Sequence, residues 1–193
     1  MSFNESILFL RSFIHNPKRV GSIIPSSRFL ADSMVKQAPW PEVKAVAELG
    51  SGTGAITRAI SSKVNKNKTT KVLLFEMDET MRDNLKKEYP DFSCYPNAAR
   101  LLETMTDSHI HHLDCIFSGL PFFNFEAELR NTLVEQIYQS LKPEGLFIAF
   151  QYSLQMKKQL SEYFIIDTIR YVPFNFPPAF VYVCRKRDTI INN

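Results

Sequence analysis

Apolar and polar residues succeed one another along the chain in blocks that predict strands and helices in turn. Short, nearly continuous apolar stretches predict five strands, at 43–49, 71–76, 92–95, 113–118 and 145–152. Between them apolar residues recur every three or four positions, which predicts helices at 53–65, 79–88, 98–105 and 126–141. Strands that are apolar throughout are buried on both faces, so this pattern indicates an α/β fold with a parallel sheet covered by helices on both sides.

The pattern changes toward the end of the chain. After a helix predicted near 155–162, apolar strands at 165–173 and 179–185 follow one another with no helix between them. Consecutive strands joined by a short connection pair antiparallel. We therefore expect a seven-stranded, mostly parallel sheet with an antiparallel hairpin at one edge.

The first part of the chain predicts helices outside the sheet. Residues 3–15 have an apolar stripe with helical spacing, and this helix ends before Pro17 because a proline disfavours helical geometry in the residue preceding it. A second predicted helix follows it. We expect one domain over residues 1–193, in which residues 1–40 form an N-terminal helical cap and residues 41–193 form the core.

Composition narrows the class of protein. The 193 residues are 45% hydrophobic, which suits one domain with a sizeable core, and a net charge of +3 is too small to indicate a nucleic-acid partner. Cys94, Cys115 and Cys184 are isolated in apolar stretches, which favours buried thiols in a reducing cytoplasm over a disulfide or metal pair. No apolar stretch approaches the roughly 18–20 residues that span a bilayer, and no signal-peptide pattern opens the chain.

A glycine-rich turn joins the first predicted strand to the helix after it. Gly50, Gly52 and Gly54 stand at every second position there, and a strand–glycine turn–helix is typical of a site for a nucleotide-like ligand. Glycine permits positive φ and a close approach of a ligand to the backbone. No lysine followed by serine or threonine completes a P-loop, and Thr57 stands where a dinucleotide site has its third glycine. A tight turn without a ligand is the alternative.

Two carboxylates beside this turn favour a ligand without phosphates. Ligands of parallel sheets bind beyond the carboxyl ends of the strands. Glu48, just before the turn, would repel a pyrophosphate and suits a ligand that carries an ammonium group. Glu76, at the end of the second strand, can accept hydrogen bonds from both hydroxyls of a ribose, and Met77 offers a flat apolar contact for adenine or, equally, fills the core. Ammonium, ribose and adenine together describe S-adenosylmethionine.

Specific motifs then point to a family. ELGSGTGAIT with FEMD after the next strand resembles the class I S-adenosylmethionine-dependent methyltransferase pattern, which has a Rossmann-like fold. Four segments, 20–34, 48–60, 117–125 and 175–186, together resemble the bacterial phospholipid N-methyltransferase family. That family methylates the amine of phosphatidylethanolamine at the cytoplasmic membrane surface, and rRNA adenine dimethylases share its glycine motif. The resemblance implies S-adenosylmethionine as cofactor and a phospholipid head group as methyl acceptor.

The resemblance and the strand ends together give a candidate cofactor site. Its members are Glu48, Gly50, Ser51, Gly52, Gly54, Glu76, Met77, Asn97, Ala98 and Ser118. The family usually has a Gly-Asp-Ala segment after the third strand, where this chain has Asn97 and Ala98. The carbonyl oxygen of Asn97 can still accept from the adenine amine, so we expect weaker selectivity with binding retained.

The candidate catalytic residues follow the fourth and fifth strands: Ser118, Leu120, Pro121 and Tyr152. In adenine methyltransferases an Asn or Asp in this motif anchors the flipped base, and Gly119 stands in its place here, which argues against adenine as acceptor. A primary alkylamine needs only to lose a proton and approach the methyl in line. Backbone carbonyls of 118–120 and the Tyr152 hydroxyl are the expected ammonium partners. A plain proline turn and a core tyrosine are the alternatives, and Asn175 is read as a hairpin turn or a substrate contact.

The expected surroundings follow from the helix at 3–15, whose apolar side is accompanied by basic residues, Arg11, Lys18, Arg19 and Arg28. An amphipathic helix with basic residues is typical of attachment to an anionic membrane surface, and a lid over the cofactor is the alternative. We expect a cytoplasmic protein attached to the inner face of the cell membrane, with no nucleic acid as partner. An RNA or small-molecule N-methyltransferase and a non-catalytic cofactor-binding module remain as rival functions.

Overall fold

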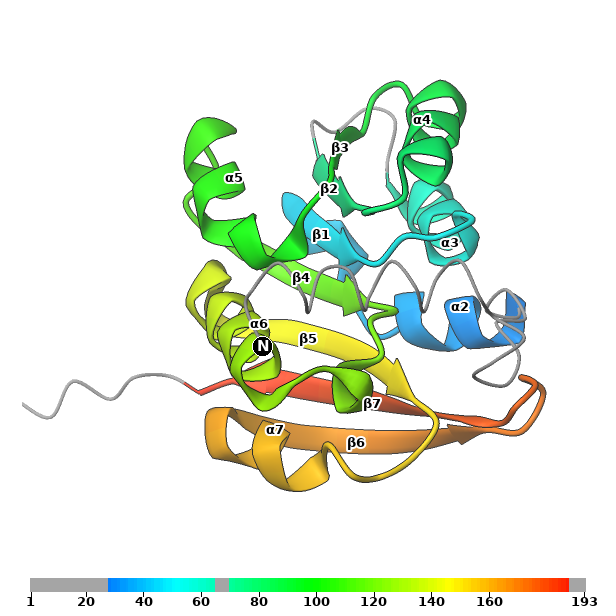
Figure 1. Ribbon diagram of the computed structural model, residues 1–193, viewed down its shortest axis with the longest axis vertical. Helices are drawn as coiled ribbons and strands as arrows, with labels where there is room; N and C mark the ends of the chain where they lie inside the picture. The colour runs from blue at the N-terminus through cyan, green and yellow to red at the C-terminus, as the bar shows by residue number, and fades with distance from the viewer. Residues whose placement is uncertain (1–27, 65–69, 188–193) are drawn as a thin grey trace, which may run out of the picture.

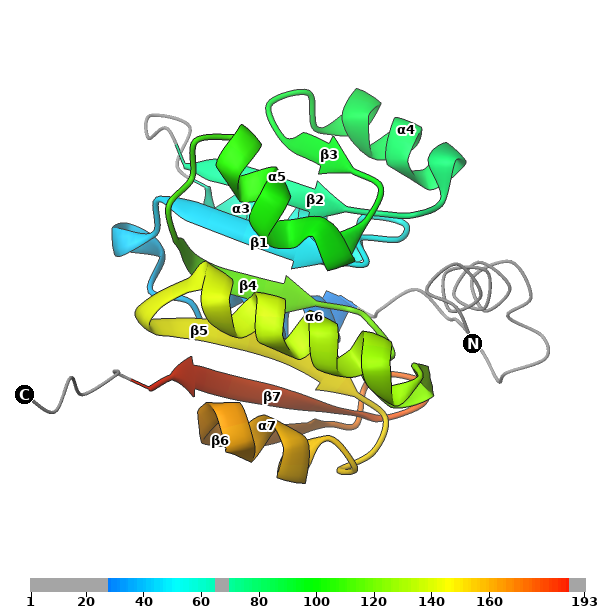
Figure 2. The same ribbon diagram turned by 60° about the vertical axis from the view of Figure 1, so that its left-hand side comes forward.

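A seven-stranded sheet runs through the centre of the protein and carries helices on both faces (Figure 1, Figure 2). This computed structural model describes residues 28–64 and 70–187. The helix predicted at 3–15, with its role as a membrane anchor or lid, lies outside the described residues.

The strands confirm the expected arrangement. They are β1 (Ala45–Leu49), β2 (Lys71–Phe75), β3 (Ser93–Tyr95), β4 (Leu113–Ser118), β5 (Leu141–Gln151), β6 (Phe164–Val172) and β7 (Ala179–Lys186), and they lie side by side in the order β3-β2-β1-β4-β5-β7-β6. The first five pair in parallel, whereas β7 pairs antiparallel with both β5 and β6. Strand order reverses between β1 and β4, so the ligand crevice of such a sheet is expected at the ends of these two strands.

Within residues 28–64 and 70–187, three helices cover each face of the sheet. One face carries α2 (Arg28–Val35), α3 (Ala55–Lys63) and α4 (Glu79–Glu88). The other carries α5 (Leu101–Asp107), α6 (Ala127–Ser140) and α7 (Lys157–Tyr163). The 3-10 turns η2 (Trp40–Glu42), η3 (Ala98–Arg100) and η4 (Phe122–Asn124) complete the described elements.

Alternating side chains of the central strands fill two cores. On β1, Val46 faces α2 and α3, while Ala47 and Leu49 face the helices of the opposite side, and all three are fully buried. Burial on both faces explains why the central strands are apolar throughout. No helix in the described part of the chain is both long and apolar enough to cross a membrane.

The start of β5 differs from the prediction. The sequence predicts a helix to 141 and a strand from 145, but α6 ends at Ser140 and β5 begins at the next residue. The register is irregular there, because Leu113 pairs with Leu141 whereas Cys115 pairs with Leu146. The extra residues include Pro143, which has no N–H to donate and is tolerated at such a bulge. The pattern of apolar and polar residues at the start of β5 is therefore typical of a loop.

Candidate cofactor and acceptor site

The glycine turn between β1 and α3 has the backbone geometry that only glycine adopts readily. Gly50, Gly52 and Gly54 have φ angles of 76°, 52° and 81°, in the left-handed region. The N–H groups of Gly50 and Ser51 both donate to the carbonyl oxygen of Phe75 at the end of β2, at 2.8 and 3.1 Å. The turn is therefore fixed against the neighbouring strand.

The turn after β1 and the loop after β4 pack against each other through two of their glycines. A Cβ on Gly50 would lie 2.9 Å from Cδ2 of Leu120, and a Cβ on Gly119 would lie 3.0 Å from the carbonyl oxygen of Gly50. The Gly119 N–H also donates to the Leu49 carbonyl, at 2.9 Å. A side chain at position 119 would crowd the Gly50 carbonyl, which is a steric argument against Asn there that the sequence alone does not give.

Gly52 differs from the other two glycines of the turn. A Cβ there would meet no heavy atom within 4 Å, so packing does not require glycine at this position. Its positive φ still favours glycine, and the open space beside its backbone would let a ligand approach closely.

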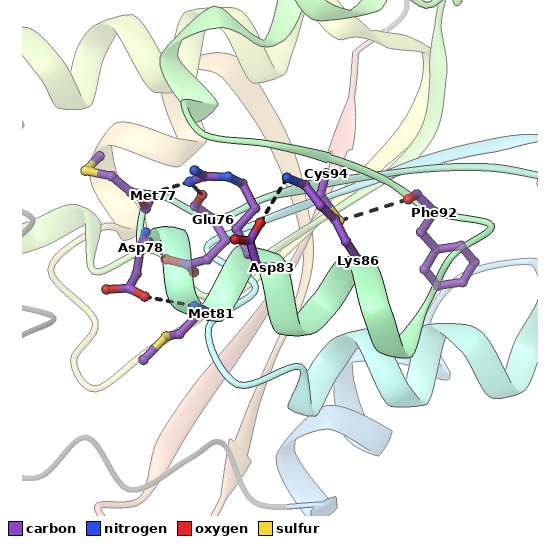
Figure 3. Close-up of polar contacts among 9 residues, drawn as sticks. Glu76, Met77, Asp78, Met81, Asp83, Lys86, Phe92 and Cys94 are labelled. Carbon is purple, nitrogen blue, oxygen red and sulfur yellow. Dashed lines mark hydrogen bonds and ion pairs between the residues drawn. The ribbon is translucent and has the colours of Figure 1, made fainter.

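Glu76 lies at the tip of β2, and Figure 3 shows it beside Asp78 at the start of α4. Its Oε2 accepts from the Gly52 N–H at 2.7 Å, and its Oε1 accepts from the Asp78 N–H at 2.8 Å. Burial raises the pKa of this carboxyl, and the backbone hydrogen bonds act in the opposite direction. Since a carboxylate has about four acceptor positions, Glu76 can still accept from a hydroxyl of a ligand. Asp78 accepts from the Met81 N–H and so caps α4.

Glu48 is completely buried behind the turn. Its Oε2 accepts from the hydroxyl of Thr57 at 2.7 Å, which gives a role to the residue that replaces the third glycine of a dinucleotide motif. Burial, with a smaller contribution from the charge of Glu76, raises the pKa of Glu48 to about 8, so the carboxyl is protonated at neutral pH unless a cation approaches it.

Two polar atoms at this site lack a protein partner. Oε1 of Glu48 and Oγ of Ser51 are buried and have no hydrogen-bond partner among the described residues. An unsatisfied buried polar atom costs about 1–3 kcal/mol, so such atoms commonly mark a place where a ligand or water binds. Both belong to the set predicted from the sequence to hold the cofactor.

The residues at the ends of β2 and β3 lie at the same edge of the sheet. Met77 is half-buried and packs against the core on the α5 and α6 side. The Oδ1 of Asn97 accepts from the Ala99 N–H at 2.9 Å, which caps η3, and Ala98 is half-buried. The oxygen expected to accept from adenine thus already has one donor.

Arg82 is a residue of this site that the sequence did not indicate. Its Nη1 donates to the carbonyls of Glu76 and Met77, both at 3.0 Å, and thereby fixes the connection between β2 and α4. In the sequence, an arginine near the start of a polar helix cannot be distinguished from one that is simply exposed to solvent.

The loop after β4 is held by buried hydrogen bonds. Ser118 is fully buried, and its Oγ accepts from the Leu120 N–H at 3.1 Å. The Leu120 carbonyl accepts from Nε2 of Gln151 at 2.9 Å and from the Phe122 N–H at 3.0 Å. Both lone pairs of this carbonyl are engaged, so it is a poor ammonium partner, contrary to expectation. Gln151, which the sequence did not indicate, is instead the residue that positions the loop. Pro121 follows as a half-buried residue.

Tyr152 lies just past the end of β5 and is 47% exposed. Its ring packs edge-on against Phe150, with centroids 5.7 Å apart. Burial raises the pKa of its hydroxyl, and a hydrogen bond with the side chain of Asn175 partly offsets this. Asn175 is buried and its Nδ2 donates to the Pro177 carbonyl at 2.7 Å, so the β6–β7 connection is tied to the end of β5.

A hollow beside the glycine turn shares only Gly52 with these residues. A cavity of about 530 Å³ is bordered by Gly52, Thr53 and the side of α4 that carries Leu85. Leu85 and Leu120 belong to the cores on opposite faces of the sheet. The buried, hydrogen-bonded groups at the strand ends therefore define the candidate site better than this cavity.

A doubly wound sheet with a left-handed glycine turn after β1 and a carboxylate at the end of β2 is typical of proteins that bind a nucleoside or nucleotide at the ends of these strands. The family described as "methyltransferase domain" matches residues 46–145. The ornithine lipid N-methyltransferase of Singulisphaera acidiphila is 30% identical over 186 residues, which cover 94% of this chain and 96% of that protein. The chain therefore belongs to the methyltransferase domain family, is a class I methyltransferase and uses S-adenosylmethionine as cofactor.

Solved structures agree with the fold. The 1,6-didemethyltoxoflavin-N1-methyltransferase of Burkholderia thailandensis has a TM-score of 0.72 at 13% identity and matches 97% of this chain and 92% of its own. The N-methyltransferase NodS of Bradyrhizobium japonicum WM9, solved with S-adenosyl-L-homocysteine, has a TM-score of 0.67 at 10% identity and matches 94% of this chain and 98% of its own. At these identities the likeness concerns the fold alone.

Proposed function

We propose that the protein transfers methyl groups from S-adenosylmethionine to the primary amine of an aminolipid head group. The observation that carries this proposal is the 30% identity to an ornithine lipid N-methyltransferase over nearly the full length of both chains. Ornithine lipids and the phosphatidylethanolamine expected from the sequence share the same chemistry, a primary amine on a head group with acyl chains. A lipid acceptor also implies work at a membrane surface, in keeping with the expected attachment to the inner face of the cell membrane.

The described residues fit the cofactor. The open space beside Gly52 admits a ligand close to the backbone, and the remaining acceptor capacity of Glu76 suits a ribose hydroxyl. The unpartnered oxygen of Glu48 suits the ammonium group, whose charge would favour the ionised carboxylate. We assign Met77, Asn97 and Ala98 to the adenine.

The acceptor amine is assigned to the loop after β4. When bound, the cofactor supplies an activated methyl group on a sulfonium, so the protein has to position the amine, exclude water and take up one proton. Ser118 and Gln151 fix the loop, and we assign the apolar side of the acceptor site to Leu120 and Pro121. The Tyr152 hydroxyl is the polar group that orients the amine.

Transfer of a labelled methyl group tests the proposal. The purified protein is incubated with methyl-labelled S-adenosylmethionine and vesicles that contain ornithine lipid, phosphatidylethanolamine or only lipids without an amine. We expect label in one or both aminolipids and none in the amine-free vesicles. Label that enters only structured RNA or a water-soluble amine would overturn the lipid assignment. Glu76→Gln serves as the inactive variant, because it removes the charge and replaces one of the two acceptor oxygens by a donor.

A further inference from the structure

Exposed apolar side chains gather at one edge of the sheet. Eight large apolar side chains are exposed in the described part of the chain, and six of them form what we name the aromatic rim: Phe29, Phe123, Leu154, Tyr171, Phe174 and Phe176. Tyr152 of the acceptor site adjoins it, whereas Ile165 lies at the beginning of β6, at the opposite edge. Phe174 and Phe176 are 75% and 71% exposed.

The aromatic rim joins segments that are far apart in the sequence. Phe29, at the start of α2, packs against Phe174 of the β6–β7 connection, with ring centroids 5.7 Å apart. Phe123 follows β4 and Leu154 follows β5, so both belong to the same carboxyl edge of the sheet. The first two figures place the β6–β7 connection on the side toward which β4 and β5 point (Figure 1, Figure 2). Exposed apolar side chains that gather at one edge in this way are typical of an interaction surface.

Charges beside the aromatic rim indicate the kind of partner. The rim residues lie in four segments, 28–29, 122–126, 152–158 and 170–178. These segments contain four exposed basic residues, Arg28, Lys157, Lys158 and Arg170, and one exposed acidic residue, Glu126. Arg28 forms an ion pair with Asp32 on the same helix, at 3.7 Å, so the excess of positive charge comes from the other three. Exposed aromatic side chains with surrounding lysines and arginines suit the interface of a bilayer that contains anionic lipids.

The aromatic rim lies on the same half of the carboxyl edge as the acceptor loop. The glycine turn and Glu76 occupy the β1–β2 half of the carboxyl edge, and the rim occupies the β4–β6 half, beside the acceptor loop. A lipid head group stays at the bilayer surface, so an enzyme that methylates it must bring the acceptor loop to that surface. A water-soluble amine would make no such demand. We infer that the aromatic rim docks the protein onto an anionic bilayer and so presents lipid amines to the loop after β4; this inference rests on the proposed function.

A double variant tests the docking surface. Phe29→Ser with Phe174→Ser removes two rim side chains that touch each other, and Ile165→Ser removes an exposed apolar side chain at the opposite edge as a control. Co-flotation with vesicles of phosphatidylglycerol and phosphatidylethanolamine measures bilayer affinity. We expect the double variant to lose at least about tenfold in vesicle affinity and the control to retain the original affinity. Calorimetric titration with S-adenosyl-L-homocysteine is expected to give the same affinity for all three proteins.

Three results would overturn the docking surface. The first is unchanged vesicle binding in the double variant, and the second is an equal loss of binding in Ile165→Ser. The third is a dimer of the original protein that only the double substitution converts to a monomer, because the rim would then bind a second copy of the chain. The proposed function fails separately. If the rim binds vesicles but no aminolipid accepts label, even when dispersed in detergent, the docking surface stands and the proposed acceptor falls. If dispersed lipid is methylated while rim substitutions leave vesicle binding unchanged, the acceptor stands and the docking surface falls.

Discussion

Ser51 carries a buried hydroxyl that has no hydrogen-bond partner among the described residues. Ser51→Ala removes that unsatisfied group, so we expect the free energy of unfolding without cofactor to stay the same or rise by up to about 1 kcal/mol. The affinity for S-adenosyl-L-homocysteine is expected to fall roughly three- to tenfold, because the ligand loses a hydrogen bond. Urea denaturation and calorimetric titration measure the two quantities. A loss of stability with full affinity would show that the hydroxyl serves the fold.

Glu48 gives the protein a predictable dependence on pH. Its pKa of about 8 in the folded state lies above the value of 4.5 for an unperturbed carboxyl, so the folded state binds the proton more tightly. The resulting stabilisation is complete below pH 4.5 and is lost as the pH rises through 8. Relative to Glu48→Gln, which cannot ionise, the original protein should lose on the order of a few kcal/mol of unfolding free energy between pH 5 and 9.

Urea denaturation of both proteins at a series of pH values measures this difference. The comparison with Glu48→Gln cancels the contribution of other titrating groups, including Glu76, whose pKa is also raised. Curves that stay parallel across this range would contradict the buried, protonated state of Glu48.

The sequence predicted the chemistry of single residues better than their contacts. The glycines of the turn and the carboxylates of Glu48 and Glu76 were indicated because they adjoin a recognisable strand end. Gln151 and Arg82 were missed, since their role depends on which carbonyls lie within reach after folding; the partner of Gln151 lies 31 positions away. The contact between Gly119 and Gly50 was hidden for the same reason.

At the scale of elements, the loops after β1 and β4 pack against each other as one unit. Gln151 of β5 holds this unit by donating a hydrogen bond to the Leu120 carbonyl. Gln151→Leu keeps the side-chain size but withdraws the donor from the Leu120 carbonyl. We expect about 1–2 kcal/mol less stability and a decrease in kcat of roughly tenfold, with cofactor affinity within about twofold of the original, because the substitution misplaces the acceptor loop and leaves the cofactor half intact.

Gln139→Leu is the matched control, because Gln139 is exposed on α6 and bonds only Glu135 on the same helix in the described structure. Its kcat is expected to remain unchanged. Equal kcat values for the two leucine variants would show that Gln151 serves stability alone.

Strands and helices were predictable where their pattern was strong. The helix at 79–88 and the strand at 113–118 have the predicted bounds, since α4 has a clear cap and β4 is buried on both faces. The start of β5 was missed because a bulge disrupts the ladder where Glu144 takes a positive φ of 60°, and nothing in the local pattern separates that from a loop.

At the scale of the whole molecule, the two halves of the carboxyl edge carry different kinds of side chain. Carboxylates and glycines occupy the tips of β1 and β2, while aromatic side chains occupy those of β4, β5 and β6. The sequence predicted the methyltransferase class because its motifs are local. It did not predict the aromatic rim, because the six side chains come from four separated segments that only the fold brings together.

The central claim is that the methyl group reaches the head-group nitrogen of an aminolipid. Mass spectrometry of lipids extracted after incubation with trideuteromethyl-labelled S-adenosylmethionine tests it most directly, because fragmentation locates the label. We predict deuteromethyl groups on the amine nitrogen of ornithine lipid or phosphatidylethanolamine. Label on an oxygen, or on a soluble amine or RNA with the lipids unlabelled, would contradict it.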